Sequence, residues 1–116
     1  MKKIDRAFGW LLALGGVGHG IGSYKAYHEQ PATLLWALAA SFAFFLLAAV
    51  NIVRAGRTDD RTLAWISFAG CVVWIGFVAW FGVLIGDVLD FRPLVNLVIT
   101  VVLAGFSLRS ALAGRG

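Results

Sequence analysis

Four long apolar segments, separated by short polar connections, constrain this chain more than any other feature of its sequence. They cover residues 8–24, 32–53, 63–85 and 94–112. Each is close to the about 20 residues with which a helix crosses a hydrocarbon core of about 30 Å. In lipid a segment must satisfy its own backbone hydrogen bonds, which favours helices. The sequence therefore predicts an all-α integral membrane protein with four transmembrane helices.

The composition agrees with this class and leaves room for one domain. Of the 116 residues, 60% are hydrophobic and 14% are charged, whereas a soluble domain carries about 25% charged residues. The connections are too short for a second folded unit, so residues 1–116 are expected to form a single transmembrane domain. Cys71 is the only cysteine, which excludes an intramolecular disulfide and a thiolate metal cluster.

The basic residues predict the orientation of the bundle. Helices joined by short loops alternate in direction, which gives an up-down-up-down bundle. Lys25 and Arg92 then lie on one side of the membrane. The other side carries Lys2, Lys3, Arg6, Arg54, Arg57, Arg61, Arg109 and Arg115. Because basic residues collect on the cytoplasmic side, we expect a multi-pass protein of the cell inner membrane with both termini in the cytoplasm.

The first apolar segment holds an ionisable residue, His19, well inside its span. On a helix, at about 100° per residue, the histidine shares a face with small residues, and bulky side chains occupy the opposite face. Small residues let two membrane helices approach closely. The expected helix-packing interface consists of Gly15, Gly16, Gly18, Gly20 and Gly22.

Two interpretations of His19 follow. Ionisable groups inside a membrane are costly and often serve as proton sites, ligand contacts or metal or haem ligands. Alternatively, a neutral histidine bonds a serine, a threonine or a backbone carbonyl across a helix interface. Haem ligation would need a second histidine from another subunit, because one chain offers no further intramembrane histidine.

The other three segments carry weakly polar side chains at helical spacing. Such residues are common at contacts between membrane helices, and they can also line a pore or pocket. The candidate ligand or proton site consists of His19, Trp74, Asn96 and Thr100. The remaining weakly polar positions are Ser41, Asn51, Ser67, Cys71 and Ser107.

The two loops expected outside the cell hold His28, Glu29, Asp87 and Asp90. Histidine and carboxylate groups are metal ligands, but these residues do not show the spacing of a known metal motif. We therefore expect a solvated loop surface and predict no metal site. The sequence identifies no cofactor.

Catalytic motifs are absent: the chain has no HExxH, no GxSxG and no phosphate-binding loop. An enzyme acting on a lipid is therefore the least favoured class. In length and four-segment layout the chain resembles the small multidrug resistance transporters. That family carries a glutamate in its first span, which couples protons to substrate. Here the span at residues 8–24 has no acid, and His19 is its nearest ionisable group.

Two functions remain open. The first is a small oligomeric transporter or channel, with a path at the subunit interface and His19 beside it. The alternative is a non-transporting membrane module that binds a lipid, a quinone, a haem or a partner membrane protein as an accessory subunit. Glycine-rich faces favour a homo-oligomer, most simply a dimer. The expected surroundings are membrane lipids, and no stacking aromatic platform supports nucleic-acid binding.

Overall fold

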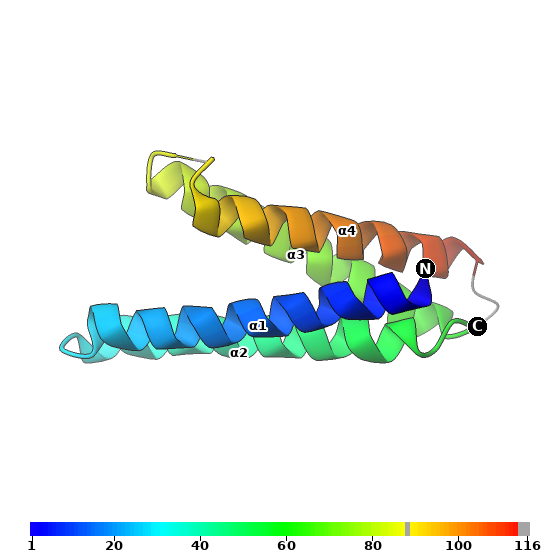
Figure 1. The fold of residues 1–116 in the computed structure, drawn as a ribbon, viewed down its shortest axis with the longest axis horizontal. Helices are drawn as coiled ribbons and strands as arrows, with labels where there is room; N and C mark the ends of the chain where they lie inside the picture. Colours follow the sequence, from blue (N-terminus) through cyan, green and yellow to red (C-terminus); the bar gives the residue numbers. More distant parts are fainter. Residues whose placement is uncertain (88, 114–116) are drawn as a thin grey trace.

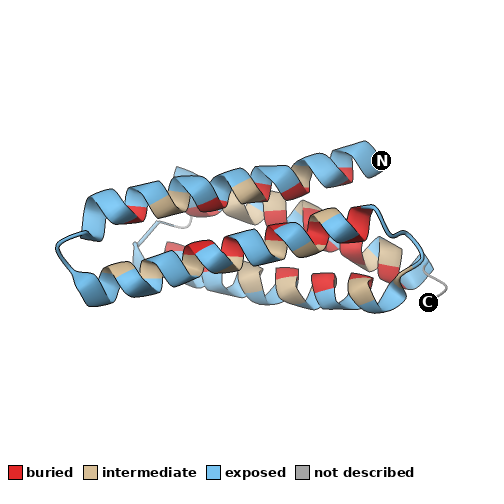
Figure 2. Ribbon diagram, turned by 90° about the horizontal axis from the view of Figure 1, so that it is seen from below, coloured by how far each residue is buried: buried red, intermediate tan, exposed pale blue. Residues whose placement is uncertain are grey.

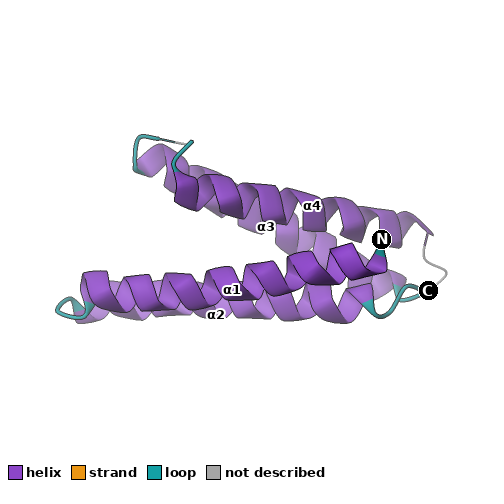
Figure 3. Ribbon diagram, in the orientation of Figure 1, coloured by secondary structure: helices purple, strands orange, loops and turns teal. Residues whose placement is uncertain are grey.

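The computed structural model describes residues 1–87 and 89–113, and this part of the chain is all-helical (Figures 1 and 3). The four helices are α1 (Lys2–Tyr27), α2 (Pro31–Ala55), α3 (Arg61–Leu84) and α4 (Phe91–Ala113). They run alternately up and down, as Figure 1 shows. The start of α1, the end of α4 and the α2–α3 turn lie together at what we call the terminal end. The α1–α2 and α3–α4 turns form the loop end.

The bundle is built from two hairpins that contact each other unequally along their length. Within the pairs α1–α2 and α3–α4 the helices pack extensively, and contacts between the two pairs are fewer. The hairpins meet at the terminal end and diverge toward the loop end (Figure 1). The molecule is elongated, with extents of 49 × 24 × 21 Å. Helices of about 25 residues, rising about 1.5 Å per residue, account for about 38 Å of the greatest length.

Three helices, α2, α3 and α4, are long and apolar enough to cross a membrane. Many of their large apolar side chains point outward, as at Trp36, Phe77 and Val83. Such a surface is costly in water and suits hydrocarbon. Helix α1 is equally long but less apolar, because its 26 residues include six glycines as well as charged residues near its start.

Local sequence explains where the helices begin and end. Pro31 occupies the first turn of α2, where its missing N–H costs nothing. The Asp60 carboxylate accepts a hydrogen bond from the Leu63 N–H at 2.9 Å and so caps the start of α3. Just beyond α3, Gly86 adopts a φ of 78°, which glycine tolerates and which turns the chain toward α4.

All four helices extend past the apolar segments that the sequence suggested, at one end or at both. Helix α1 begins at Lys2, so Asp5 lies inside it, and α2 continues to Ala55 and includes Arg54. From the sequence, Arg54 was expected among the basic residues of the cytoplasmic side, whereas no pattern pointed to Asp5. Their inclusion in helices turns Asp5 and Arg54 toward the interior, where both are buried.

The core is small and lies between the four helices. It consists of Leu12, Phe44, Ala48, Cys71, Leu103 and Ala104. Figure 2 shows the buried positions on the inward faces of the helices, while the loop end is largely exposed. The alanines and the cysteine keep the helices close together in this region, as small residues do in membrane bundles.

Candidate functional site

The most strongly polar part of the interior is an ion pair between Asp5 of α1 and Arg54 of α2. Arg54 donates from Nη1 to Asp5 Oδ2 at 2.7 Å and from Nη2 to Asp5 Oδ1 at 2.6 Å. This two-pronged geometry is the strongest form of an arginine–carboxylate contact. The Arg54 side chain is 0% exposed and that of Asp5 is 8% exposed, so both charges are removed from solvent.

The remaining donors of Arg54 are also engaged. Its Nε–H donates to Ser67 Oγ at 3.2 Å, and its other contacts reach Asn51 Oδ1 at 3.1 Å and Ser110 Oγ at 3.5 Å. A guanidinium has five N–H groups, and the five contacts found here match that number. The charge is therefore fully compensated within the protein.

Asn51 connects the ion pair to the last two helices. Its Oδ1 accepts hydrogen bonds from Ser67 Oγ at 2.9 Å and from Ser107 Oγ at 3.3 Å. The hydroxyls of Ser67 and Ser107 also lie 2.8 Å apart. All four helices thus contribute to a buried ion-pair network, whose members are Asp5, Asn51, Arg54, Ser67, Ser107 and Ser110.

Sequence reasoning found only part of this network. It identified Asn51, Ser67 and Ser107 as weakly polar positions, but it counted Arg54 only among the basic residues that mark the cytoplasmic side. One signal was present: Arg54 follows Asn51 by three residues at the end of an apolar segment, so the two share a helix face. Nothing in the sequence paired Arg54 with Asp5, because that contact spans 49 positions.

A second group of side chains crosses the bundle closer to the loop end. His19 of α1 lies against Phe44 of α2, with ring centroids 5.4 Å apart. Phe44 in turn meets Trp74 of α3 edge-on, with centroids 4.7 Å apart. Trp74 Nε1 donates to Oδ1 of Asn96 on α4 at 3.2 Å. We call these four residues, one from each helix, the aromatic row.

The structure places each residue of the candidate ligand or proton site in or beside this row. His19 and Asn96 are partly buried, and the Trp74 side chain packs on the core. Thr100 lies one turn after Asn96, is fully buried, and donates to the Asn96 backbone carbonyl at 2.8 Å. The four residues of the candidate site are therefore connected through contacts. Phe44 is the link between His19 and Trp74, and the sequence did not identify this link.

His19 is hydrogen-bonded across a helix interface. Its Nε2–H donates to the backbone carbonyl of Ala37 on α2 at 3.1 Å. This is the arrangement that the second interpretation of His19 requires. In the neutral form the bond leaves Nδ1 as an acceptor. Coordination of a haem iron through Nε2 would require this bond to break.

The five glycines of the expected packing interface divide into two groups. Gly15, Gly16 and Gly20 face α2: a Cβ at Gly16 would lie 2.8 Å from Phe44 Cβ, one at Gly15 3.3 Å from the Phe44 ring, and one at Gly20 3.4 Å from Ser41 Oγ. Gly18 and Gly22 face outward, with no described heavy atom within 4 Å of an added Cβ. Within one chain, therefore, α1 uses only part of its glycine surface to contact α2.

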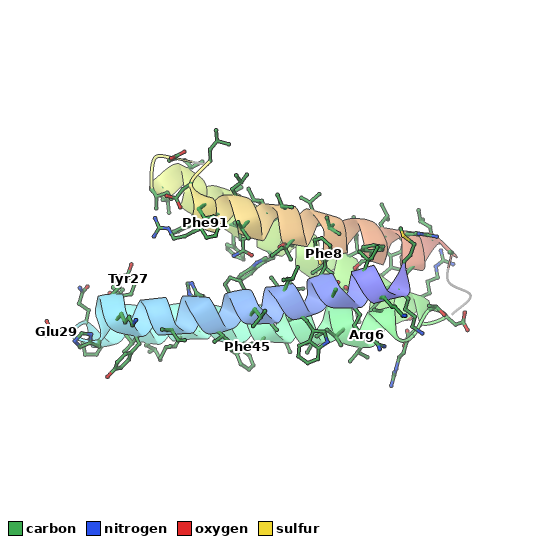
Figure 4. All side chains as sticks on the ribbon, in the orientation of Figure 1. Arg6, Phe8, Tyr27, Glu29, Phe45 and Phe91 are labelled. Atoms are coloured by element: carbon green, nitrogen blue, oxygen red, sulfur yellow. The ribbon has the colours of Figure 1, made fainter. Side chains whose placement is uncertain are left out.

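The loop residues do not converge on a metal site. His28 lies 3.8 Å from Glu29 at the tip of the first hairpin, whereas Asp87 and Asp90 lie on the other tip. The tips diverge, as the labelled Glu29 and Phe91 show in Figure 4. Among residues 1–87 and 89–113, no group of three or more histidine, cysteine, aspartate or glutamate side chains is placed to hold a metal ion.

Asp90 organises the start of α4. Its Oδ1 accepts hydrogen bonds from the Arg92 N–H at 3.0 Å and from Arg92 Nε at 3.1 Å. The side-chain hydrogen bond from Arg92, followed by the backbone one, lowers the pKa of Asp90 below its ordinary value. These bonds to the ionised carboxylate hold the first turn of the helix.

The lowered pKa of Asp90 predicts a stabilising effect that depends on pH. A carboxyl group whose pKa is lower in the folded state stabilises the fold above its unfolded pKa, and this contribution disappears as the pH falls through the folded value. We therefore expect Asp90→Ala to lower the melting temperature in detergent at pH 7, with the difference shrinking below about pH 4. Melting curves of both proteins at pH 7 and pH 3 test this, and an equal difference at both pH values contradicts it.

No family model, curated protein or solved structure matches this chain.

Proposed function

We propose that this protein is a small multi-pass membrane protein that binds a neutral, lipid-soluble ligand between its two hairpins. The observation that carries the proposal is the aromatic row. It brings one side chain from each helix into a chain of contacts that crosses from one hairpin to the other, and the hairpins diverge toward the loop end (Figure 1). Binding sites in helix bundles are commonly formed by side chains on facing helices.

The interior of one chain argues against a conduit along the bundle axis. Between the aromatic row and the buried ion-pair network, the helices contribute apolar core residues such as Leu12, Ala48 and Leu103. Beyond the core, the guanidinium of Arg54 is bonded to protein on every side. An ion crossing one chain would meet first an apolar barrier and then a closed polar cluster. A binding role fits this interior better than a pore does.

The chemistry of the row favours an uncharged ligand with a ring and an oxygen acceptor. Phe44 and Trp74 offer aromatic faces and edges. Asn96 uses Oδ1 to accept from Trp74, and its amide nitrogen donates to no atom of the described residues. A carbonyl oxygen is the complementary partner for that amide. A quinone combines a flat ring with carbonyl oxygens and dissolves in lipid, so it is the class we propose.

Quenching of tryptophan fluorescence by a short-chain benzoquinone in detergent tests this proposal. Asn96→Leu removes both the acceptor for Trp74 and the amide donor. We expect it to weaken binding about tenfold, which corresponds to about 1.4 kcal/mol, within the range for a lost buried hydrogen bond. Trp74→Phe is expected to weaken binding to a similar extent.

Trp80→Phe is the matched control for Trp74→Phe. Trp80 lies on the same helix but is 62% exposed, so its replacement should leave the dissociation constant unchanged. Equal quenching of the wild type, Asn96→Leu and Trp74→Phe would show that the quinone only partitions into the micelle. That result would contradict the proposed site.

A second candidate function, transport along a subunit interface, is supported by the outward-facing glycines. Gly18 and Gly22 are four residues apart and open to a neighbouring helix, which is the spacing of close helix association in lipid. In this case the path would form between copies of the chain, with His19 near it. Unchanged flux and proton dependence of His19→Ala in proteoliposomes would exclude that role for the histidine.

We also infer that α1 crosses the membrane with the other helices and that the terminal end faces the cytoplasm of an inner membrane. Antiparallel packing of α1 on α2 supports the crossing. The concentration of basic residues at the terminal end supports the orientation. A fluorescent protein fused to the C-terminus should fold and emit light if that end is cytoplasmic. A dark fluorescent fusion, together with an active periplasmic reporter enzyme fused at the same position, would reverse the assignment.

A further inference from the structure

The two ends of the described bundle differ sharply in charge once the buried pair is set aside. Asp5 and Arg54 neutralise each other inside the protein. The terminal end then carries six exposed basic side chains: Lys2, Lys3, Arg6, Arg57, Arg61 and Arg109. Against these six stand the two carboxylates of Asp59 and Asp60, which leaves a charge of +4. Arg115, which the sequence placed at this end, lies outside the described residues.

The loop end has the opposite sign. Its basic residues are Lys25 and Arg92, and its carboxylates are Glu29, Asp87 and Asp90, so two positive charges against three negative ones leave −1. Arg92 is also paired with Asp90 at 3.1 Å. The excess of positive charge is therefore confined to the terminal end.

One part of this cationic surface has a defined geometry. Arg6 extends from α1 to the α2–α3 turn, where its Nη2 lies 3.1 Å from the position that a Cβ would take at Gly56 (Figure 4). The absent side chain of Gly56 leaves room for the Arg6 guanidinium at this turn, and Arg57 is the next residue along the chain. Arg57 contacts Asp60 only at 3.9 Å and is 66% exposed. No carboxylate of the described residues lies within salt-bridge distance of Arg6.

The surroundings of Arg6 and Arg57 further reduce the local negative charge. Asp5, the nearest acid to Arg6 in the sequence, is turned inward and bonded to Arg54. Asp60 uses Oδ1 to cap α3, which leaves Oδ2 for its long contact with Arg57. Two guanidinium groups therefore flank one turn at the edge of the apolar surface with little internal compensation.

We propose that Arg6 and Arg57 form a site for the phosphate group of an anionic membrane lipid. Guanidinium groups bind phosphate oxygens through paired, charge-assisted hydrogen bonds. The bound headgroup would lie at the α2–α3 turn while its acyl chains lie along the exposed apolar surfaces of the helices. Charge complementarity selects an anionic headgroup over a zwitterionic one, because the latter brings its own positive charge to a surface that is already cationic.

Native mass spectrometry of protein released from nanodiscs tests the site. The nanodiscs contain equal amounts of phosphatidylglycerol and phosphatidylcholine with matched acyl chains. We expect the wild type to retain phosphatidylglycerol in several-fold excess over phosphatidylcholine. The double variant Arg6→Gln/Arg57→Gln should retain the two lipids nearly equally. Lys25→Gln, at the loop end, is the matched control and should preserve the wild-type preference.

A parallel measurement with inorganic phosphate distinguishes a lipid site from a site for free anions. If an about tenfold excess of inorganic phosphate over lipid leaves the phosphatidylglycerol preference intact, the lipid is the ligand. Loss of the preference in phosphate would reject the lipid and indicate a free-anion site. Equal retention of both lipids by the wild type, or an unchanged preference in the double variant, would also overturn the proposal. A melting temperature for each variant shows whether it remains folded.

Discussion

Replacing Asp5 by asparagine is expected to destabilise the bundle by about 3–5 kcal/mol, the range for removing one partner of a buried ion pair. The reason is the environment of Arg54, which is 0% exposed and would retain its charge without a carboxylate. The two hydrogen bonds from Arg54 to the Asp5 carboxylate, at 2.6 and 2.7 Å, would be lost or replaced by weaker bonds to an uncharged amide. Thermal or denaturant unfolding in a defined micelle measures the change.

Two further variants distinguish the cost of a buried unpaired charge from the stabilisation that the ion pair itself contributes. The double variant Asp5→Leu/Arg54→Met removes both charges, and apolar replacement of a buried pair is often neutral or stabilising. We therefore expect it to recover most of the stability that Asp5→Asn loses. Arg57→Met, which removes an exposed arginine, should change stability by at most about 1 kcal/mol. An Asp5→Asn protein as stable as the wild type would contradict the role assigned to the network.

Gly16→Leu is expected to separate α1 from α2 at a cost of about 3 kcal/mol, the upper part of the usual range for overpacking. Even a Cβ at Gly16 would lie 2.8 Å from Phe44 Cβ and 3.0 Å from Phe45 Cε1. The Phe44 atom is attached directly to the backbone of α2, so it cannot move aside without moving the helix. Because Phe44 also contacts His19 and Trp74, the variant should also weaken quinone binding.

Gly18→Leu is the matched control for Gly16→Leu. It lies two residues away on the same helix, and no described heavy atom is within 4 Å of an added Cβ. In a monomer the change should stabilise α1 by up to about 1 kcal/mol, because leucine is the better helix former. Unfolding curves of the two variants should therefore shift in opposite directions. Equal destabilisation by both would contradict the assignment of Gly16, and not Gly18, to the α1–α2 contact.

The same pair of variants bears on self-association. If Gly18 lies between two copies of the chain, Gly18→Leu would lower the oligomer mass in native mass spectrometry while the protomer stays folded. Gly16→Leu would instead act on the protomer. The two variants therefore distinguish contacts within one chain from contacts between chains. A homodimer requires contacts of the second kind.

The helical architecture follows from local chemistry and was predictable from the order of residues. Apolar stretches of helix length occur where α2, α3 and α4 lie, and Pro31, Asp60 and Gly86 mark ends and turns for reasons of backbone geometry. These effects act within a few residues, so they can be read along the chain. The weakly polar positions Asn51, Ser67 and Ser107 were visible for the same reason, as residues on one face of a helix.

The partners of those residues could not be read in this way, since they depend on how the helices pack. Whether Arg54 meets solvent or a carboxylate is decided by the rotation of α2 against α1, which brings together residues 49 positions apart. Its contact with Ser110 spans 56 positions. The burial of a charge is favourable only when several helices supply hydrogen bonds together. The position of Phe44 between His19 and Trp74 is likewise a product of packing, because no spacing in the chain connects α1, α2 and α3.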